Sequence, residues 1–273
     1  MKLTRPRCIQ FEISTFCNAN CIFCPHSEMT RPQGTMSDEM FHRIIKEGKE
    51  MGVRRFILFL NGEPFVNTKI FEWLDYMQEK NVKTLLFTNA SLLNKEKIDK
   101  LVQYKNIKRI NCSINAASKE IYDKVTRGPN YNKVVENVKY LLEKAPFHVT
   151  SEMTVVKENA HEISEFIKTW KGHNHINTFA NWAGYRHNSV ETTGEKVYCS
   201  SLNNMYILWD GRVCLCCMDF DGHVILGDLN KQSLQEVWDN SESVRSRHSV
   251  LDFDMDLCRD CNLNCINRKL INK

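Results

Sequence analysis

The sequence has no long apolar run. No segment approaches the roughly 18 consecutive apolar residues that a membrane-spanning helix needs, and the N-terminal MKLTRPRCIQ contains no apolar stretch of signal-peptide length. An excess of one charge is also missing, because 37 basic and 33 acidic residues leave a net charge of +4 without a basic block. We therefore expect a cytoplasmic protein that binds neither a membrane nor a nucleic acid.

Cysteine, by contrast, is abundant, with 12 residues in a chain of 273. Disulfides are rare in the reducing cytoplasm, so this number indicates metal ligation rather than a disulfide framework. Three cysteines lie together in the stretch CNANCIFC, and seven more lie beyond residue 198. The other two, Cys8 and Cys112, fall in predicted strands, and we expect them in the core.

Apolar runs rich in β-branched residues alternate with amphipathic helical patterns up to about residue 185. The expected strands are 9–14, 54–60, 82–88, 108–114, 147–156 and a last one around 175–180. The expected helices are 37–52, 68–80, 94–104, 118–126, 131–144 and 161–170. This alternation predicts an α/β protein whose parallel sheet is covered by helices, as an open sheet or a partial barrel.

Polar segments follow the first four predicted strands. These segments are CNANCIFC, NGEPF, TNA and SINA, in chain order. Ligands of parallel α/β folds bind beyond the carboxyl ends of the strands. We therefore expect the four segments to meet at one edge of the sheet and to form one site.

The three clustered thiols, Cys17, Cys21 and Cys24, are compatible with two kinds of metal centre. A structural zinc site uses four ligands, typically in two short pairs, whereas this loop supplies three and offers only His26 as a fourth. An iron–sulfur cube binds one cysteine per iron, so three cysteines leave one iron open to a ligand that is not protein. The count favours the cube but does not identify that ligand.

The CxxxCxxC motif after the first strand resembles the defining motif of the radical S-adenosylmethionine (SAM) superfamily, with Phe23 at its usual aromatic position. The resemblance extends over about residues 8–185 and implies a partial (β/α)6 barrel. It also implies a 4Fe–4S cluster on Cys17, Cys21 and Cys24, whose open iron the amino and carboxylate groups of SAM chelate. An electron, from a donor such as flavodoxin or ferredoxin, would cleave SAM to a 5′-deoxyadenosyl radical that removes a substrate hydrogen atom.

Other segments are similar to the SAM-binding motifs of this superfamily. The turn Asn61-Gly62-Glu63-Pro64 resembles its GGEP motif, which binds the SAM amino group, with Asn in place of the first Gly. CSINAAS resembles its ISIDGAS segment, which makes Ser113 a candidate SAM contact. Arg127 looks like the arginine that pairs with the SAM carboxylate, a task that suits a planar and permanently charged group. The remaining candidates by this resemblance are Asn89 and Asn159.

The cysteines beyond residue 198 surround a predicted hairpin with an Asp210-Gly211 turn and a short helix at 232–240. From spacing alone, a zinc ribbon is one interpretation. The segment also resembles the SPASM/twitch domain, whose shorter form binds one auxiliary 4Fe–4S cluster through four cysteines. The resemblance implies a core domain at 1–186 and an auxiliary domain at 187–273. It assigns the second cluster to Cys199, Cys217, Cys258 and Cys261, with Cys216 as the alternative to Cys217.

Four thiolates leave no open iron, so the second cluster is expected to transfer electrons. The layout resembles compact radical SAM dehydrogenases that oxidise a secondary alcohol of an aminocyclitol. Arg186 and His187 are the candidate bases. A spare thiol such as Cys214, Cys216 or Cys265 would instead allow epimerisation by returning a hydrogen atom.

Three functions are compatible with these sequence features. The first is an enzyme that oxidises or epimerises a small sugar- or cyclitol-like molecule. The second is a maturase of a ribosomally made peptide, and the third is a non-catalytic iron–sulfur electron carrier. No extra peptide-recognition domain precedes the first predicted strand, which favours the small molecule.

Overall fold

The computed structural model describes residues 3–185, 195–263 and 265–266. Its main feature is a sheet of nine strands in the order β10-β9-β8-β1-β2-β3-β4-β5-β6. The first six strands in the chain are β1 (Ile9–Phe11), β2 (Arg55–Leu58), β3 (Lys83–Thr88), β4 (Ile107–Ser113), β5 (His148–Thr154) and β6 (Asn174–Asn177). Neighbouring strands from β1 to β6 are all parallel, which confirms the predicted partial barrel.

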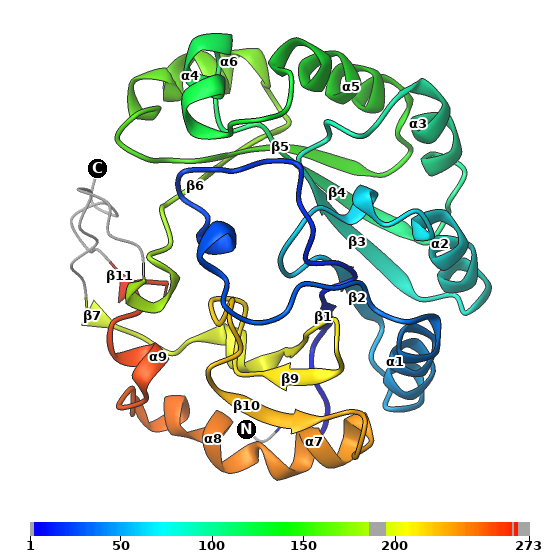
Figure 1. Ribbon diagram of the computed structural model, residues 1–273, viewed down its shortest axis with the longest axis vertical. Coiled ribbons are helices and arrows are strands. Elements are labelled where there is room, and N and C mark those ends of the chain that lie inside the picture. The colour runs from blue at the N-terminus through cyan, green and yellow to red at the C-terminus, as the bar shows by residue number, and fades with distance from the viewer. Residues whose placement is uncertain (1–2, 186–194, 264, 267–273) are drawn as a thin grey trace.

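Helices surround the outside of this curved sheet (Figure 1). They are α1 (Asp38–Glu50), α2 (Ile70–Glu79), α3 (Lys95–Leu101), α4 (Lys119–Val125), α5 (Tyr131–Lys144) and α6 (Ile163–Thr169). Helix α1 begins where the sequence predicted, because the Ser37 hydroxyl accepts a hydrogen bond from the backbone N–H of Met40 at 3.2 Å and so caps the helix.

The two faces of the barrel strands differ in composition. Alternate residues such as Phe56, Leu86 and Ile110 join the core beneath the helices. The residues between them point to the opposite side, called here the inner face. Its members in β2 to β5, matched by strand register, are Arg55, Ile57, Lys83, Leu85, Phe87, Arg109, Asn111, Ser113, His148, Thr150 and Glu152.

The C-terminal segment extends the same sheet. Strands β8 (Met205–Ile207) and β9 (Arg212–Cys214) form the predicted hairpin, and β8 pairs in parallel with β1. The sequence did not predict that pairing, nor the third strand β10 (Ile225–Asp228), which pairs with β9. Helix α7 (Leu234–Asn240) matches the expected helix and starts with a capping box.

The remaining elements are short. They are β7 (Glu195–Lys196), β11 (Cys265–Ile266), α8 (Glu242–Ser246), α9 (Asp256–Arg259), η1 (Pro25–Glu28), η2 (Pro64–Val66), η3 (Ala160–Glu162), η4 (Trp182–Gly184), η5 (Ser200–Asn203) and η6 (Arg247–Val250). Among the residues that the structure describes, no helix combines the length and the apolar character needed to cross a bilayer.

Candidate cluster and cofactor site

The cysteine loop between β1 and α1 lies in the middle of the ring of strands and carries η1 (Figure 1). Backbone hydrogen bonds hold it to the end of α4, because Asn20 N–H donates to the Arg127 carbonyl at 3.0 Å and Ile22 N–H donates to the Val125 carbonyl at 2.9 Å. From the other side, the Trp182 indole N–H donates to the Phe23 carbonyl at 2.8 Å. Segments far apart in the sequence therefore position this loop.

The three thiols of the loop interact electrostatically. Burial raises the pKa of Cys17 to about 11 and the pKa of Cys21 further, and the charge of Cys24 contributes in both cases. Bringing three thiolates together is unfavourable unless a metal offsets their charge, and a coordinating thiol is deprotonated outright. The donor set therefore fits a cationic metal centre.

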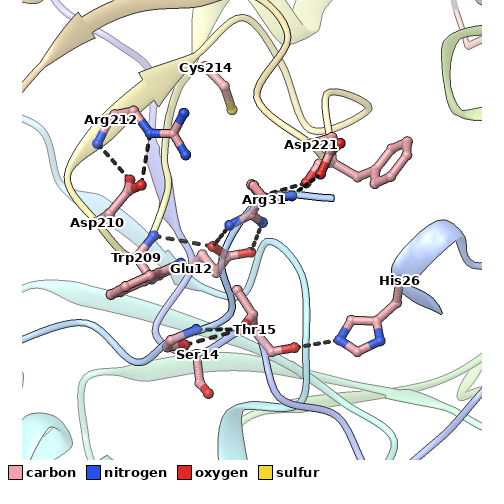
Figure 2. Close-up of polar contacts among 12 residues, drawn as sticks. Glu12, Ser14, Thr15, His26, Arg31, Trp209, Asp210, Arg212, Cys214 and Asp221 are labelled. Atoms are coloured by element: carbon pink, nitrogen blue, oxygen red, sulfur yellow. Dashed lines mark hydrogen bonds and ion pairs between the residues drawn. The ribbon is translucent and has the colours of Figure 1, made fainter. Parts of the chain in front are cut away.

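A single-ion site is a poorer fit. No group of three or more His, Cys, Asp or Glu side chains in the described part of the chain converges tightly enough to hold one metal ion. In a cube each thiolate binds a different iron, so its ligands need not converge on one point. The fourth zinc ligand considered from the sequence, His26, is engaged elsewhere, because its Nε2 contacts the Thr15 carbonyl at 2.5 Å (Figure 2).

The NGEP turn after β2 packs directly on the backbone that leads into the cysteine loop. Glu63 N–H donates to the Phe16 carbonyl at 2.9 Å. Gly62 has a φ of +78°, and a Cβ at that position would lie 2.3 Å from the Ser14 carbonyl oxygen. The Asn61 Nδ2 atom beside it is buried and has no hydrogen-bond partner, which leaves a donor for a bound group.

Replacing Gly62 with alanine should strongly destabilise the protein. The change adds left-handed backbone strain and a backbone clash, for which we expect a loss of about 3 kcal/mol or more. Gly172 is the matched control, because its φ is +81° but no atom lies within 4 Å of an added Cβ. G172A should cost about 1 kcal/mol. Thermal unfolding measures both, and equal losses would show that the contact with Ser14 is unimportant.

The Glu63 carboxylate accepts three hydrogen bonds from its own chain, one of them from the Phe65 backbone N–H at 3.1 Å. It accepts hydrogen bonds from the Thr88 hydroxyl at 2.6 Å and from Asn89 N–H at 2.7 Å, and its burial raises its pKa. Glu63 therefore ties the NGEP turn to the end of β3. Its contact with the SAM amino group stays a prediction, as does that of Pro64, which begins η2.

The other predicted SAM residues lie around the same edge of the sheet. Asn89 donates to the Asn18 side chain of the cysteine loop at 2.9 Å, and half-buried Ser113 ends β4. Arg127 is exposed with a φ of +54°, and its Nε–H donates to the Lys124 carbonyl at 3.2 Å. Asn159 is fully buried and donates to the Asn115 and Thr154 carbonyls, which ties together the loops after β4 and β5. Their contacts with SAM remain predictions.

The second cysteine set also clusters. Burial raises the pKa of Cys258 to about 11, and the charges of Cys261 and Cys199 raise it further. The pKa of Cys217 is likewise raised to about 11 by burial, and Cys199 and Cys261 again contribute. Cys199 and Cys261 thus lie within electrostatic reach of both Cys217 and Cys258. None of the described cysteines forms a disulfide.

Cys216 differs from Cys217 in its surroundings. Burial and the charge of Cys217 raise the pKa of Cys216, and Cys261 also contributes. Cys216 packs against the apolar cluster that contains Cys258, so the choice between Cys216 and Cys217 as the fourth auxiliary ligand stays a prediction. The remaining catalytic candidates, Arg186 and His187, lie outside the described residues. Cys8 and Cys112 are buried, as predicted.

A buried ion pair links the cysteine loop to the C-terminal hairpin, and the sequence did not reveal it. The Arg31 guanidinium donates to both oxygens of Glu12 at 2.8 and 2.5 Å, and its Nε–H donates to the Phe220 carbonyl at 2.9 Å (Figure 2). The Asp221 carboxylate accepts from the backbone N–H of Thr30 at 2.8 Å and of Arg31 at 3.0 Å. The one signal in the sequence is an acidic residue after the first strand, Glu12, and an arginine after the cysteine loop, Arg31, which could have predicted an ion pair.

Comparisons with known proteins agree with this geometry. The family model of the radical SAM superfamily matches residues 11–169, and that of the SPASM iron–sulfur cluster-binding domain matches residues 199–262. Over 162 residues the chain is 28% identical to the AdoMet-dependent heme synthase of Methanosarcina barkeri, an alignment that covers 59% of this chain and 46% of that relative. The chain thus spans about half the length of this relative or less.

Solved structures show the same fold. Streptococcus suis SuiB bound to the precursor peptide SuiA matches with a TM-score of 0.77 at 17% identity, covering 99% of this chain and 74% of SuiB. BtrN in complex with AdoMet and 2-DOIA matches with a TM-score of 0.68 at 17% identity, covering 96% of this chain and 94% of BtrN. At these identities the likeness concerns the fold.

Proposed function

Because the chain belongs to the radical SAM superfamily, we propose that it is an oxidoreductase that abstracts a hydrogen atom from a small sugar- or cyclitol-like substrate and oxidises it. When bound, the first 4Fe–4S cluster and SAM would supply the 5′-deoxyadenosyl radical, and the auxiliary 4Fe–4S cluster would accept an electron. The observation that carries the proposal is the mutual proximity of thiols in each of two separate cysteine sets.

The chain's own residues hold and orient these groups. Cys17, Cys21 and Cys24 would bind the first cluster, and the unpartnered Nδ2 of Asn61 offers a hydrogen bond to a group beside it. Because the loop is hydrogen-bonded to α4 and to Trp182, its position does not depend on the cluster alone. Cys199, Cys217, Cys258 and Cys261 are proposed to hold the auxiliary cluster, with the domain boundary near residue 186.

Modification of a peptide is the second candidate. The similarity to SuiB, solved with a precursor peptide, covers nearly the whole of this chain. BtrN was solved with the small molecule 2-DOIA. The match covers 94% of BtrN, compared with 74% of SuiB.

Anaerobic incubation of reconstituted, dithionite-reduced protein with SAM tests the proposal. We expect 5′-deoxyadenosine and methionine, detected by mass spectrometry. Cyclitols and amino sugars, or candidate precursor peptides, are then added. The substrate class is the one whose mass falls by two hydrogen atoms. An absence of 5′-deoxyadenosine under all these conditions would favour a non-catalytic electron carrier.

Replacing Cys258 and Cys261 together with alanine should halve the iron content, from about eight to about four atoms per chain, because only the auxiliary cube is lost. SAM cleavage should persist in part, since the first cluster keeps its ligands. Iron analysis and 5′-deoxyadenosine formation measure the two effects. If the double variant keeps the full iron content, the auxiliary ligands are assigned wrongly.

A further inference from the structure

Polar atoms without partners lie on the inner face where β4 and β5 run side by side. Asn111 Oδ1 and Thr150 Oγ1 are buried, and neither has a hydrogen-bond partner. Asn111 and Thr150 are matched in the strand register, so the two side chains are neighbours on this face. A buried polar atom left unpaired costs about 1–3 kcal/mol, so two such neighbours indicate a ligand that pairs with them.

Glu152 lies one step further along the same face of β5. It is only 9% exposed, and Asn111 Nδ2 donates to its Oε1 at 2.8 Å. Among the described residues, none donates a hydrogen bond to its Oε2 atom. Glu152 is in register with Ser113, the candidate SAM contact, and its backbone carbonyl accepts from Ile114 and Asn115 at 3.0 Å. The Glu152 carboxylate thus lies at the same position along the strands as Ser113, where SAM is expected to bind.

The surroundings of Glu152 suit proton transfer near neutral pH. Burial raises the pKa of Glu152 to about 7, against the attraction of Arg109 on β4. Exposed His175, its register partner on β6, faces it from the other side, and Cys112 lies on the opposite face of β4. A carboxyl group with such a pKa changes its charge in the range in which most enzymes work.

An apolar wall lies on the neighbouring strands. The rings of Phe59 and Phe87 stack with centroids 5.4 Å apart, and both are half-buried. Phe87 is in register with Asn111, so the wall adjoins the polar group directly. A compact ring with one apolar face and hydrogen-bond donors at its edge matches this combination of surfaces.

We propose that Asn111, Thr150 and Glu152 form the substrate-recognition site, which binds a hydroxyl or amino group on a sugar- or cyclitol-sized molecule, and that Glu152 accepts the proton of that group. This inference rests on the proposed function. Glu152 would accept the O–H or N–H proton of the substrate radical left after removal of the adjacent C–H hydrogen atom, and an auxiliary cluster held by the second cysteine set would supply the acceptor for the remaining electron. The C–O or C–N single bond thereby becomes a double bond.

The test compares E152Q with wild type in calorimetric titrations of reconstituted, SAM-loaded protein. The probes are glucosamine, scyllo-inosamine, myo-inositol and a short peptide that contains serine and lysine. We expect the amino probes to bind wild type, and E152Q to bind them about tenfold or more weakly, since a hydrogen bond to a charged group is lost. E143Q, on the exposed side of α5, is the control and should bind like wild type.

The dependence on pH gives a second readout. Because the carboxylate is the binding form, affinity of wild type for the amino probes should rise between about pH 6 and about pH 8, whereas E152Q should show no such rise. Equal binding by E152Q, or saturable binding of the peptide alone or of no probe, would overturn the inference. Binding requires no SAM cleavage, so a lack of 5′-deoxyadenosine would count against the proposed function and not against this site.

Discussion

Replacing Cys17, Cys21 and Cys24 together with alanine is expected to abolish SAM cleavage and to remove about half of the iron. These thiols are the proposed ligands of the cluster with an open iron, and the four proposed auxiliary thiols would not replace them, because they would be bound to a cube of their own. Iron analysis, electron paramagnetic resonance of the reduced protein with and without SAM, and 5′-deoxyadenosine formation measure the outcome.

The matched control is alanine at the two buried core cysteines, Cys8 and Cys112. This control should keep the full iron content and the spectral change on addition of SAM, although its stability will fall. If the triple variant still cleaves SAM, or if the wild-type loop binds only zinc, the assignment of the first cluster is wrong.

Replacing Arg31 with methionine should have the largest effect on stability. It leaves the fully buried Glu12 carboxylate with one remaining donor among the residues that the structure describes, the Trp209 backbone N–H at 3.2 Å. Breaking a buried ion pair on one side typically costs about 3–5 kcal/mol. For a chain of this size the melting temperature should then fall by about 10 °C, measured anaerobically on the cluster-loaded protein.

The control for this variant is the Arg212–Asp210 pair, which lies where the turn between β8 and β9 ends (Figure 2). Both of its side chains are partly exposed, so R212M should cost less than about 1 kcal/mol. The double variant E12Q/R31M should recover much of the loss, because no buried charge then remains unpaired. Equal effects of R31M and R212M would mean that Glu12 is accessible to water in solution.

Most of the barrel could be predicted from the sequence, because its signals are local. The alternation of strand and helix patterns, the Ser37 cap and the Asp210-Gly211 turn each depend on residues close together in the chain, and all are present in the structure. The predicted strand ends were less accurate, as in β1, which ends at Phe11 rather than at residue 14. A strand ends where its backbone hydrogen bonds to the neighbouring strand end, and hydrophobic periodicity does not predict that position.

The site was predictable only as a set of loops. That the cysteine loop and the NGEP turn meet follows from the parallel sheet, since all strands end at one edge. That Glu63 is turned toward Thr88 and Asn89 does not follow, because side-chain direction depends on packing between loops. The same holds for Asn159, which binds two backbone carbonyls of its neighbouring loops.

The sequence by itself determined the β/α order, the two cysteine sets and the family to which they belong, because these depend on spacing along the chain. Only the tertiary structure decided that β8 pairs with β1, that Arg31 pairs with Glu12 and binds the Phe220 carbonyl, and that Asn111 meets Glu152. Glu12 and Arg31 belong to the same β/α unit but lie 19 residues apart. The other contacts join different strands or join the cysteine loop to the C-terminal segment. Which residues meet in such contacts depends on how the sheet closes and on which charges become buried together. Neither can be recognised from residues that are close together in the sequence.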